Sequence, residues 1–345
     1  MRRHNILYIR CRHASIMRKI QRRKIVIKIL NHIRRHRQGK QKRRRDTTCY
    51  VQDKYEVVAP IDFTINNING LIRFILEIEN VCNKDKIKLL KVNLNHVVSI
   101  DMYAISLMLS MLSKLSYKHI RYWGTYPTCL TCRQYIINSG FLDIVKSNIK
   151  GPEDKQKGTQ IYMVGKDCVD SHRIGKYVRE SMALLIGEPS VYPPVYDDIC
   201  EISANSVEHA NRHTIEKNWL VSISKEGDKL HFILTDTGLG ILTTLRKKTS
   251  QEIRDLFHKS DSEVLQDVFL KVYQSVTGEI NRHKGLPIIY ESFTEGFISN
   301  LKVLTNKVLL DFETNSSKLL NKSFNGVLFS WTVSMDNYKK WINSL

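Results

Sequence analysis

Long hydrophobic runs are missing from this chain of 345 residues. No stretch approaches the roughly 18 apolar residues of a membrane-spanning helix, so we expect no transmembrane segment. Lys and Arg interrupt every apolar run near the start, which disfavours a secretory signal. The seven cysteines are odd in number and widely scattered, as is typical of a reduced, cytoplasmic protein.

Groupings of residues that could hold zinc are also scarce. Cys129 and Cys132 form the one C-x-x-C pair, and Cys168 and Cys200 have no paired spacing. A structural zinc site needs four ligands. The cysteines therefore do not favour a metal site.

Acidic residues are absent from the first 45 positions, which hold eighteen Lys or Arg. The whole chain has a formal net charge of +20, so the rest is almost neutral. Apolar residues between 14 and 36 have the spacing of an amphipathic basic helix, and we define residues 1–47 as the basic arm. Such an arm is suited to nucleic acid. An anionic membrane surface and docking on the body or on a protein partner are the alternatives.

Residues 48–150 alternate between strand-like and helix-like segments, which indicates an α/β domain. Strands are expected at 56–65, 86–95 and 119–125, and helices at 69–81, 101–115 and 132–141. Residues 151–160 are the expected linker, and residues 161–345 form the expected second domain.

Two short segments of the first domain carry a resemblance. Ser99-Ile-Asp101 opens an apolar helix, and Ser139-Gly140-Phe141 follows the last helix. These features resemble a STAS domain, the module of anti-sigma-factor antagonists, which implies a protein partner. Met102, Tyr103 and Ala104 stand where an antagonist has its phosphorylated serine, which argues against phosphorylation here. A structural or docking α/β domain is the alternative.

A polar stripe marks the second domain. Glu201, Asn205 and His209 recur every four residues, so on a helix their side chains lie on one face. Ile202 and Ser206 lie on the opposite flank, which is small or apolar, as expected where a helix packs on a sheet.

A hairpin and a glycine loop follow this helix. Two strand-like segments flank Lys225–Asp228, which we expect to form the turn. The second strand ends at Asp236, before Gly238 and Gly240. Glycines at these positions allow a ligand to approach the backbone closely.

The order and spacing of these residues resemble the GHKL ATPases: gyrase B subunits, heat-shock chaperones, mismatch-repair ATPases, histidine kinases and anti-sigma serine kinases. The resemblance covers residues 160–345. It implies a Bergerat-type α/β sandwich, with helices on one face of a mixed sheet. By this resemblance, Asn205 holds the Mg²⁺ that bridges the phosphates of ATP, Asp236 accepts a hydrogen bond from the adenine amino group, and Glu201 polarises the attacking water or hydroxyl. Oxygen ligands suit Mg²⁺, and a carboxylate suits the base.

The later segments depart from the family. The counterpart of its glycine-rich phosphate loop is Arg282–Pro287, with the single glycine Gly285 beside Lys284. A helix that begins there offers an anion site. Residues 241–284 are the expected lid, helical in pattern, in which Arg246, Lys247 and Lys248 are candidate phosphate contacts. Val327 replaces a polar residue that relatives often carry near adenine.

Three functions fit these residues. One is an ATP-dependent GHKL-type switch in signalling or defence. The second is a serine or histidine protein kinase of the anti-sigma type, although no dimerising helical hairpin with a phosphoacceptor histidine precedes residue 160. The third is a nucleotide-binding module without hydrolysis. The resemblance also implies an ATP-linked homodimer.

Overall fold

The fold is described by a computed structural model at residues 54–84, 87–147, 155–157, 160–166, 168–209, 218–246, 259–270 and 285–345. Residues 53–345 form one compact unit. The basic arm lies outside the described residues, and its predicted helix stays a prediction. Within the described ranges, no helix combines the length and apolar character needed to cross a bilayer.

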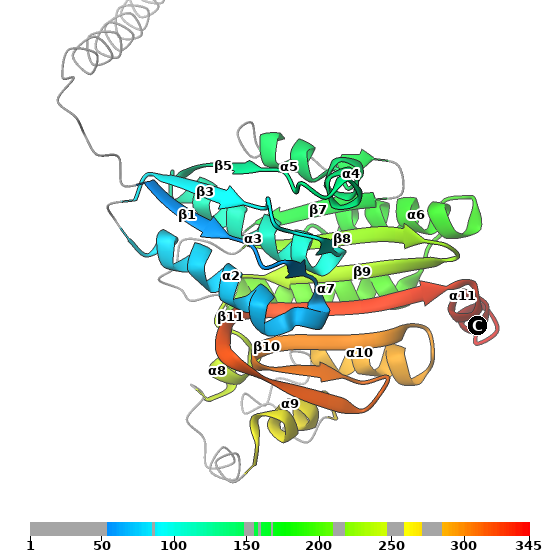
Figure 1. Cartoon of the computed structure of the whole chain (residues 1–345). Helices are drawn as coiled ribbons and strands as arrows, with labels where there is room; N and C mark the ends of the chain where they lie inside the picture. Colours follow the sequence, from blue (N-terminus) through cyan, green and yellow to red (C-terminus); the bar gives the residue numbers. More distant parts are fainter. Residues whose placement is uncertain are drawn as a thin grey trace, which may run out of the picture. The chain divides into compact units, whose positions relative to one another are not determined.

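The larger sheet has six strands in the order β10-β11-β9-β8-β7-β6 (Figure 1). They are β6 (Lys155–Lys157), β7 (Gln160–Lys166), β8 (Asn218–Glu226), β9 (Lys229–Asp236), β10 (Ser299–Asp311) and β11 (Ser316–Ser334). Every neighbouring pair is antiparallel, which differs from the mixed sheet that the resemblance implies. The physical reason is that three of the five pairs join strands consecutive in the chain through short connections, which favour antiparallel pairing. β6 lies inside the segment expected to be a linker.

The predicted hairpin of β8 and β9 is confirmed. Glu226 pairs with Lys229, so Gly227 and Asp228 form a two-residue turn. Gly227 has φ of 61°, a conformation that glycine adopts without steric cost. The register of this hairpin places Asp236 opposite Trp219 at the far end of the two strands.

Helices cover one face of the six-stranded sheet through a core that includes Trp219, Leu234 and Trp331. They are α6 (Ser171–Ile186), α7 (Pro193–His209), α8 (Ile241–Arg246), α9 (Asp261–Phe269), α10 (Gly285–Thr294) and α11 (Met335–Ile342). Residues on the opposite side of the same strands, such as Leu220 and Ile233, belong to a second core. Both faces of the sheet are therefore buried, whereas the resemblance implies helices on one face.

The second core is formed around α2 (Ile68–Cys82) and α3 (Met102–Tyr117), which lie between the six-stranded sheet and a three-stranded sheet (Figure 1). Three hydroxyl pairs join α3 to the six-stranded sheet. These are Tyr103 with Ser330 at 3.0 Å, Ser106 with Ser222 at 2.9 Å and Ser110 with Thr235 at 2.5 Å. The pairs satisfy polar groups that would otherwise be buried without a partner, and they fix α3 across three strands.

The alternation predicted for residues 48–150 is confirmed. A parallel sheet has the order β1-β3-β5, and two short strands pair beside it. Besides α2 and α3, this part of the chain contains β1 (Lys54–Val58), β2 (Asp62–Phe63), β3 (Leu89–Asn93), β4 (Ser99–Ile100), β5 (Arg121–Thr125), α4 (Leu130–Asn138) and α5 (Phe141–Ser147), with a 3₁₀ turn at Ile65–Asn67. The described residues thus form an α/β protein with parallel and antiparallel sheets.

Asp101 caps the N-terminus of α3. Its Oδ1 accepts from Ala104 N at 2.9 Å, and its Oδ2 accepts from Ile65 N at 2.7 Å. Burial raises the pKa of Asp101 to about 6; the two N–H groups oppose this rise, and the nearby Asp62 charge adds to it. Met102 and Ala104 are buried beside it, so the first turn of α3 packs inside the unit.

The raised pKa of Asp101 predicts a pH effect on stability. Because the folded protein binds this proton more tightly than the unfolded chain, the contribution is full below the unfolded pKa near 3.8 and is lost as pH rises through 6. Asp101→Asn removes the titration but keeps a good helix cap. Between about pH 3.5 and 7, the unfolding free energy of wild type should fall relative to the variant by on the order of 3 kcal/mol, measured by urea unfolding. Parallel pH profiles would contradict this expectation.

Candidate nucleotide site

Asp236 ends β9 with its side chain on the α7 face of the sheet, and it exposes only 8 % of its surface. Its Oδ1 accepts from Gly238 N and Val327 N, both at 3.0 Å. Its Oδ2 accepts from Ser206 Oγ at 2.7 Å. An ionised carboxylate has about four acceptor sites, so Oδ2 retains one for a further donor.

Burial raises the pKa of Asp236, and hydrogen bonds from Gly238, Ser206 and Val327 oppose that rise. A ligand that donates to the free position of Oδ2 would add a fourth donor to the carboxylate. Hydrogen bonds to the charged form favour it. The arrangement is therefore a buried acceptor suited to a neutral donor group such as an amine.

The loop after Asp236 is held by two residues of β10. Thr305 Oγ1 accepts from Ile241 N at 2.9 Å, and Asn306 Oδ1 accepts from Leu242 N at 3.0 Å. Asn306 Nδ2 donates to Leu239 O at 3.0 Å. These contacts satisfy backbone groups at the start of α8 and fix the loop as one conformation. Thr305 and Asn306 thus form a clamp on the loop. No periodicity in the sequence connects this clamp to the loop, since more than sixty residues separate them.

Gly240 is required where it stands. It has φ of 82°, and a Cβ added there would lie 2.6 Å from Asn306 Oδ1. Gly240→Ala should lower the unfolding free energy by about 2 to 3 kcal/mol, because left-handed strain and displacement of Asn306 add. Gly227→Ala is the matched control, since Gly227 has φ of 61° with nothing near the added Cβ; strain alone should cost about 1 kcal/mol. Equal losses in urea unfolding would show that the clamp does not depend on Gly240.

β11 closes the other side of Asp236. Val327 pairs with Asp236 in register, and it supplies a backbone N–H to Oδ1. Gly326 precedes it with φ of 144°, and a Cβ there would come within 2.3 Å of the Asp236 carbonyl oxygen. Glycine thus allows β11 to approach the end of β9 closely enough for this contact.

The predicted helix with the polar stripe is α7. Ile202 is buried and Ser206 contacts Asp236, as expected for the flank that faces the sheet. Glu201 and Asn205 are half-buried and lie one turn apart, with no hydrogen bond to another described side chain. His209 ends α7, and its side chain lies outside the described residues. On α7, Asn205 therefore directly precedes Ser206, the residue whose hydroxyl holds Asp236.

Asp198 is a further acid of α7 that the motif analysis did not single out. It is completely buried, and its Oδ1 accepts from Ser292 Oγ of α10 at 3.1 Å. Its Oδ2 has no hydrogen-bond partner among the described residues. Burial holds the pKa of Asp198 well above its ordinary value. The contact between Asp198 and Ser292 links α7 to α10 one turn before Glu201.

Only parts of the predicted phosphate loop and lid are described. Gly285 begins α10, whereas Lys284 lies outside the described residues. Arg246, a candidate phosphate contact, pairs with Asp261 and thereby joins α8 to α9. α9 is anchored in the core by Phe269, whose ring lies 4.9 Å from that of Phe312. The lid segment is therefore helical in its described parts, as predicted, and α9 belongs to the body of the fold.

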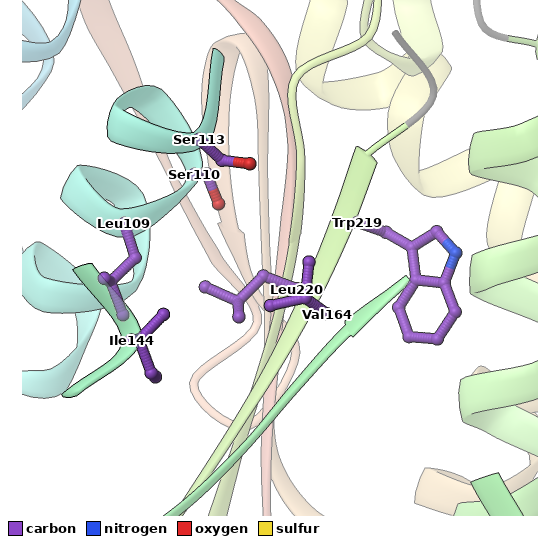
Figure 2. A pocket seen from close by; sticks show the side chains of 7 residues that line it. All are labelled: Leu109, Ser110, Ser113, Ile144, Val164, Trp219 and Leu220. Carbon is purple, nitrogen blue, oxygen red and sulfur yellow. The ribbon is translucent and has the colours of Figure 1, made fainter. Parts of the chain in front are cut away.

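A small cleft lies on the other face of the sheet, between α3, α5, β7 and β8 (Figure 2). Ser110 and Ser113 are its hydroxyl-bearing side chains, and the Trp219 ring points away from α3. The cleft has space for roughly one water molecule, so it does not suit a nucleotide. Among the described residues, no group of three or more His, Cys, Asp or Glu side chains could hold a metal ion.

Comparison of this chain with protein-family models and with curated proteins finds no match.

Proposed function

We propose that residues 161–345 bind ATP in the manner of the GHKL ATPases. The observation that carries this proposal is the Asp236 carboxylate, which is buried at the end of β9 and has three donors and one remaining acceptor position. The adenine amino group is a donor, whereas guanine has a carbonyl acceptor at the corresponding position. The site should therefore select ATP over GTP.

The roles of the neighbouring side chains follow from their chemistry. Asn205 offers an amide oxygen that would hold Mg²⁺, which takes few ligands from protein and the rest from phosphate and water. Bound Mg²⁺ would neutralise charge on the phosphates. Glu201 lies one turn away on α7 and would orient and deprotonate the nucleophile. Gly238 would let the nucleotide approach the backbone closely, while Gly240 leaves the space that Asn306 fills beside the loop.

The fate of the γ-phosphate of ATP decides between the three functions. Phosphate release from ATP alone indicates a switch that hydrolyses ATP. Transfer of labelled phosphate to a protein in a cell extract indicates a kinase, and binding without either indicates a nucleotide-binding module. Competition between ATP and GTP for a fluorescent adenine nucleotide tests the site itself. ATP should displace the probe at concentrations at least about tenfold lower than GTP, and equal displacement would refute the role of Asp236.

The composition of the basic arm favours a second activity. Its eighteen Lys or Arg accompany an almost neutral body, so we propose that the arm binds nucleic acid through phosphates. Affinity for duplex DNA should fall steeply with salt, and the slope of log affinity against log salt should give about 0.9 per phosphate contacted. Deletion of residues 1–45 should abolish this binding and leave ATP affinity unchanged. Binding to anionic vesicles without binding to DNA or RNA at low salt would indicate a membrane surface instead.

A further inference from the structure

Cys129 and Cys132 meet at the N-terminal end of α4. Cys129 is the N-cap residue that precedes the helix, and Cys132 is the third residue inside it. Cys129 makes no capping hydrogen bond, but residues three positions apart at the start of a helix lie on the same side of it, so the two side chains are neighbours. Cys129 is partly exposed, whereas Cys132 is buried with 4 % exposure. The pair therefore has one accessible sulfur and one protected sulfur.

Loops from the carboxyl ends of the parallel strands surround Cys129. Its Sγ lies 4.0 Å from Val98 O, and Val98 N donates to Ile61 O at 2.9 Å. Thr128 N donates to Asn95 O at 3.1 Å, which fixes the segment just before Cys129. This edge is where ligands bind in α/β sheets. The sulfur is thus held on a defined surface.

The surface around the pair is apolar and open. Ile61, Val98 and Leu130 expose 62, 61 and 74 % of their surface. Exposed large apolar side chains gathered in one place mark interaction sites. A reagent or an apolar segment can therefore reach Cys129 along this surface.

The two thiols differ in acidity. The amide and the side chain of Cys132 lower the pKa of Cys129, while burial raises the pKa of Cys132 to about 11. The thiolate is the nucleophile in thiol chemistry. The difference favours Cys129 as the attacking sulfur and keeps Cys132 protonated before the second step.

We propose that Cys129 and Cys132 are a redox-active dithiol, which low-molecular-weight disulfides oxidise to an intramolecular disulfide. Cys129 attacks one sulfur of the disulfide RSSR, so a mixed disulfide forms and one thiolate leaves. Cys132 then attacks Cys129 Sγ, displaces the second thiolate and gives up its proton to it. The dithiol loses two electrons and two protons, and RSSR is reduced to two RSH.

Oxidised glutathione and mass spectrometry test this proposal on the full chain. Residues 122–133 contain both cysteines and no Lys or Arg before Arg133, so trypsin releases them as one peptide. After oxidation and alkylation, this peptide should be unalkylated and lighter by two hydrogens than its reduced form. Cys132→Ser should accumulate the glutathione adduct on Cys129 by roughly tenfold over wild type, because the resolving thiol is missing. Cys129→Ser should form no disulfide in this peptide.

The exposed Cys168 is the internal reference, since it has no cysteine neighbour in the sequence. The proposal is overturned if the peptide of the oxidised wild-type chain carries only glutathione adducts, or if Cys129 reacts no faster than Cys168. The wild-type measurement stands without any variant, and Cys132→Ala replaces Cys132→Ser if thermal unfolding shows that the serine variant does not fold. No nucleotide is needed, so the result is independent of the proposed ATP site.

Discussion

Glu201→Ala is expected to lower ATP turnover by roughly 10² to 10⁴-fold while ATP still binds. Glu201 is half-buried on α7, one helical turn from Asn205 and on the same face. Loss of a general base removes a proton transfer from the transition state but no contact to adenine. Turnover is measured by phosphate release under saturating ATP, and affinity by titration of the same protein.

Two further variants separate chemistry from binding. Glu201→Gln keeps the size and polarity of the side chain but cannot accept a proton, so it should be as inactive as Glu201→Ala. Asn205→Ala should instead remove the dependence of ATP binding on magnesium. Full turnover by both Glu201 variants would exclude this residue as the base, and the absence of phosphate release or transfer in wild type would favour the binding module.

Asp236→Asn is expected to weaken ATP binding by about 1 to 3 kcal/mol, which is roughly 5- to 150-fold. The amide oxygen should take the place of Oδ1, which accepts two backbone N–H groups. The amide nitrogen then takes the place of Oδ2 and presents a donor where the adenine amino group needs an acceptor. Ser206 can accept from this nitrogen, so the fold should persist.

Ser206→Ala is the matched control for this variant. It removes the hydroxyl that donates to Oδ2 but leaves the carboxylate in place, so selectivity for ATP over GTP should remain. Asp236→Asn should lose that selectivity. Unchanged ATP affinity in a folded Asp236→Asn protein would remove Asp236 from the site.

The local structure could be predicted where neighbouring residues determine it. The hairpin follows from two apolar segments around Gly227, and the alternation of strands and helices up to residue 141 follows from periodicity. α7 could be placed with its apolar flank on the sheet because Ile202 and Ser206 share one side of the helix. In each case the signal lies within one element and its turn.

Contacts between distant segments could not be predicted. The clamp of Asn306 on the loop after Asp236, and the hydroxyl pair of Ser110 with Thr235, each join residues far apart in the chain. No sequence pattern identifies which residue of a distant strand will pair with a serine inside an apolar helix such as α3. The packing of α3 on the six-stranded sheet, and the burial of both faces of that sheet, therefore required the structure.

Those long-range contacts also connect the proposed site with the first part of the chain. Thr235 faces α3, and the next residue, Asp236, faces α7, because side chains alternate along a strand. A displacement of β9 would therefore disturb both contacts. The proposed site and the contact with α3 therefore lie on opposite faces of β9.

Isothermal titration of the full chain with ATP in the presence of magnesium tests the central claim most directly. The account predicts one bound nucleotide per chain in wild type, with binding weakened roughly 5- to 150-fold in Asp236→Asn. The absence of any binding heat, together with no rise in unfolding temperature at millimolar ATP, would contradict it.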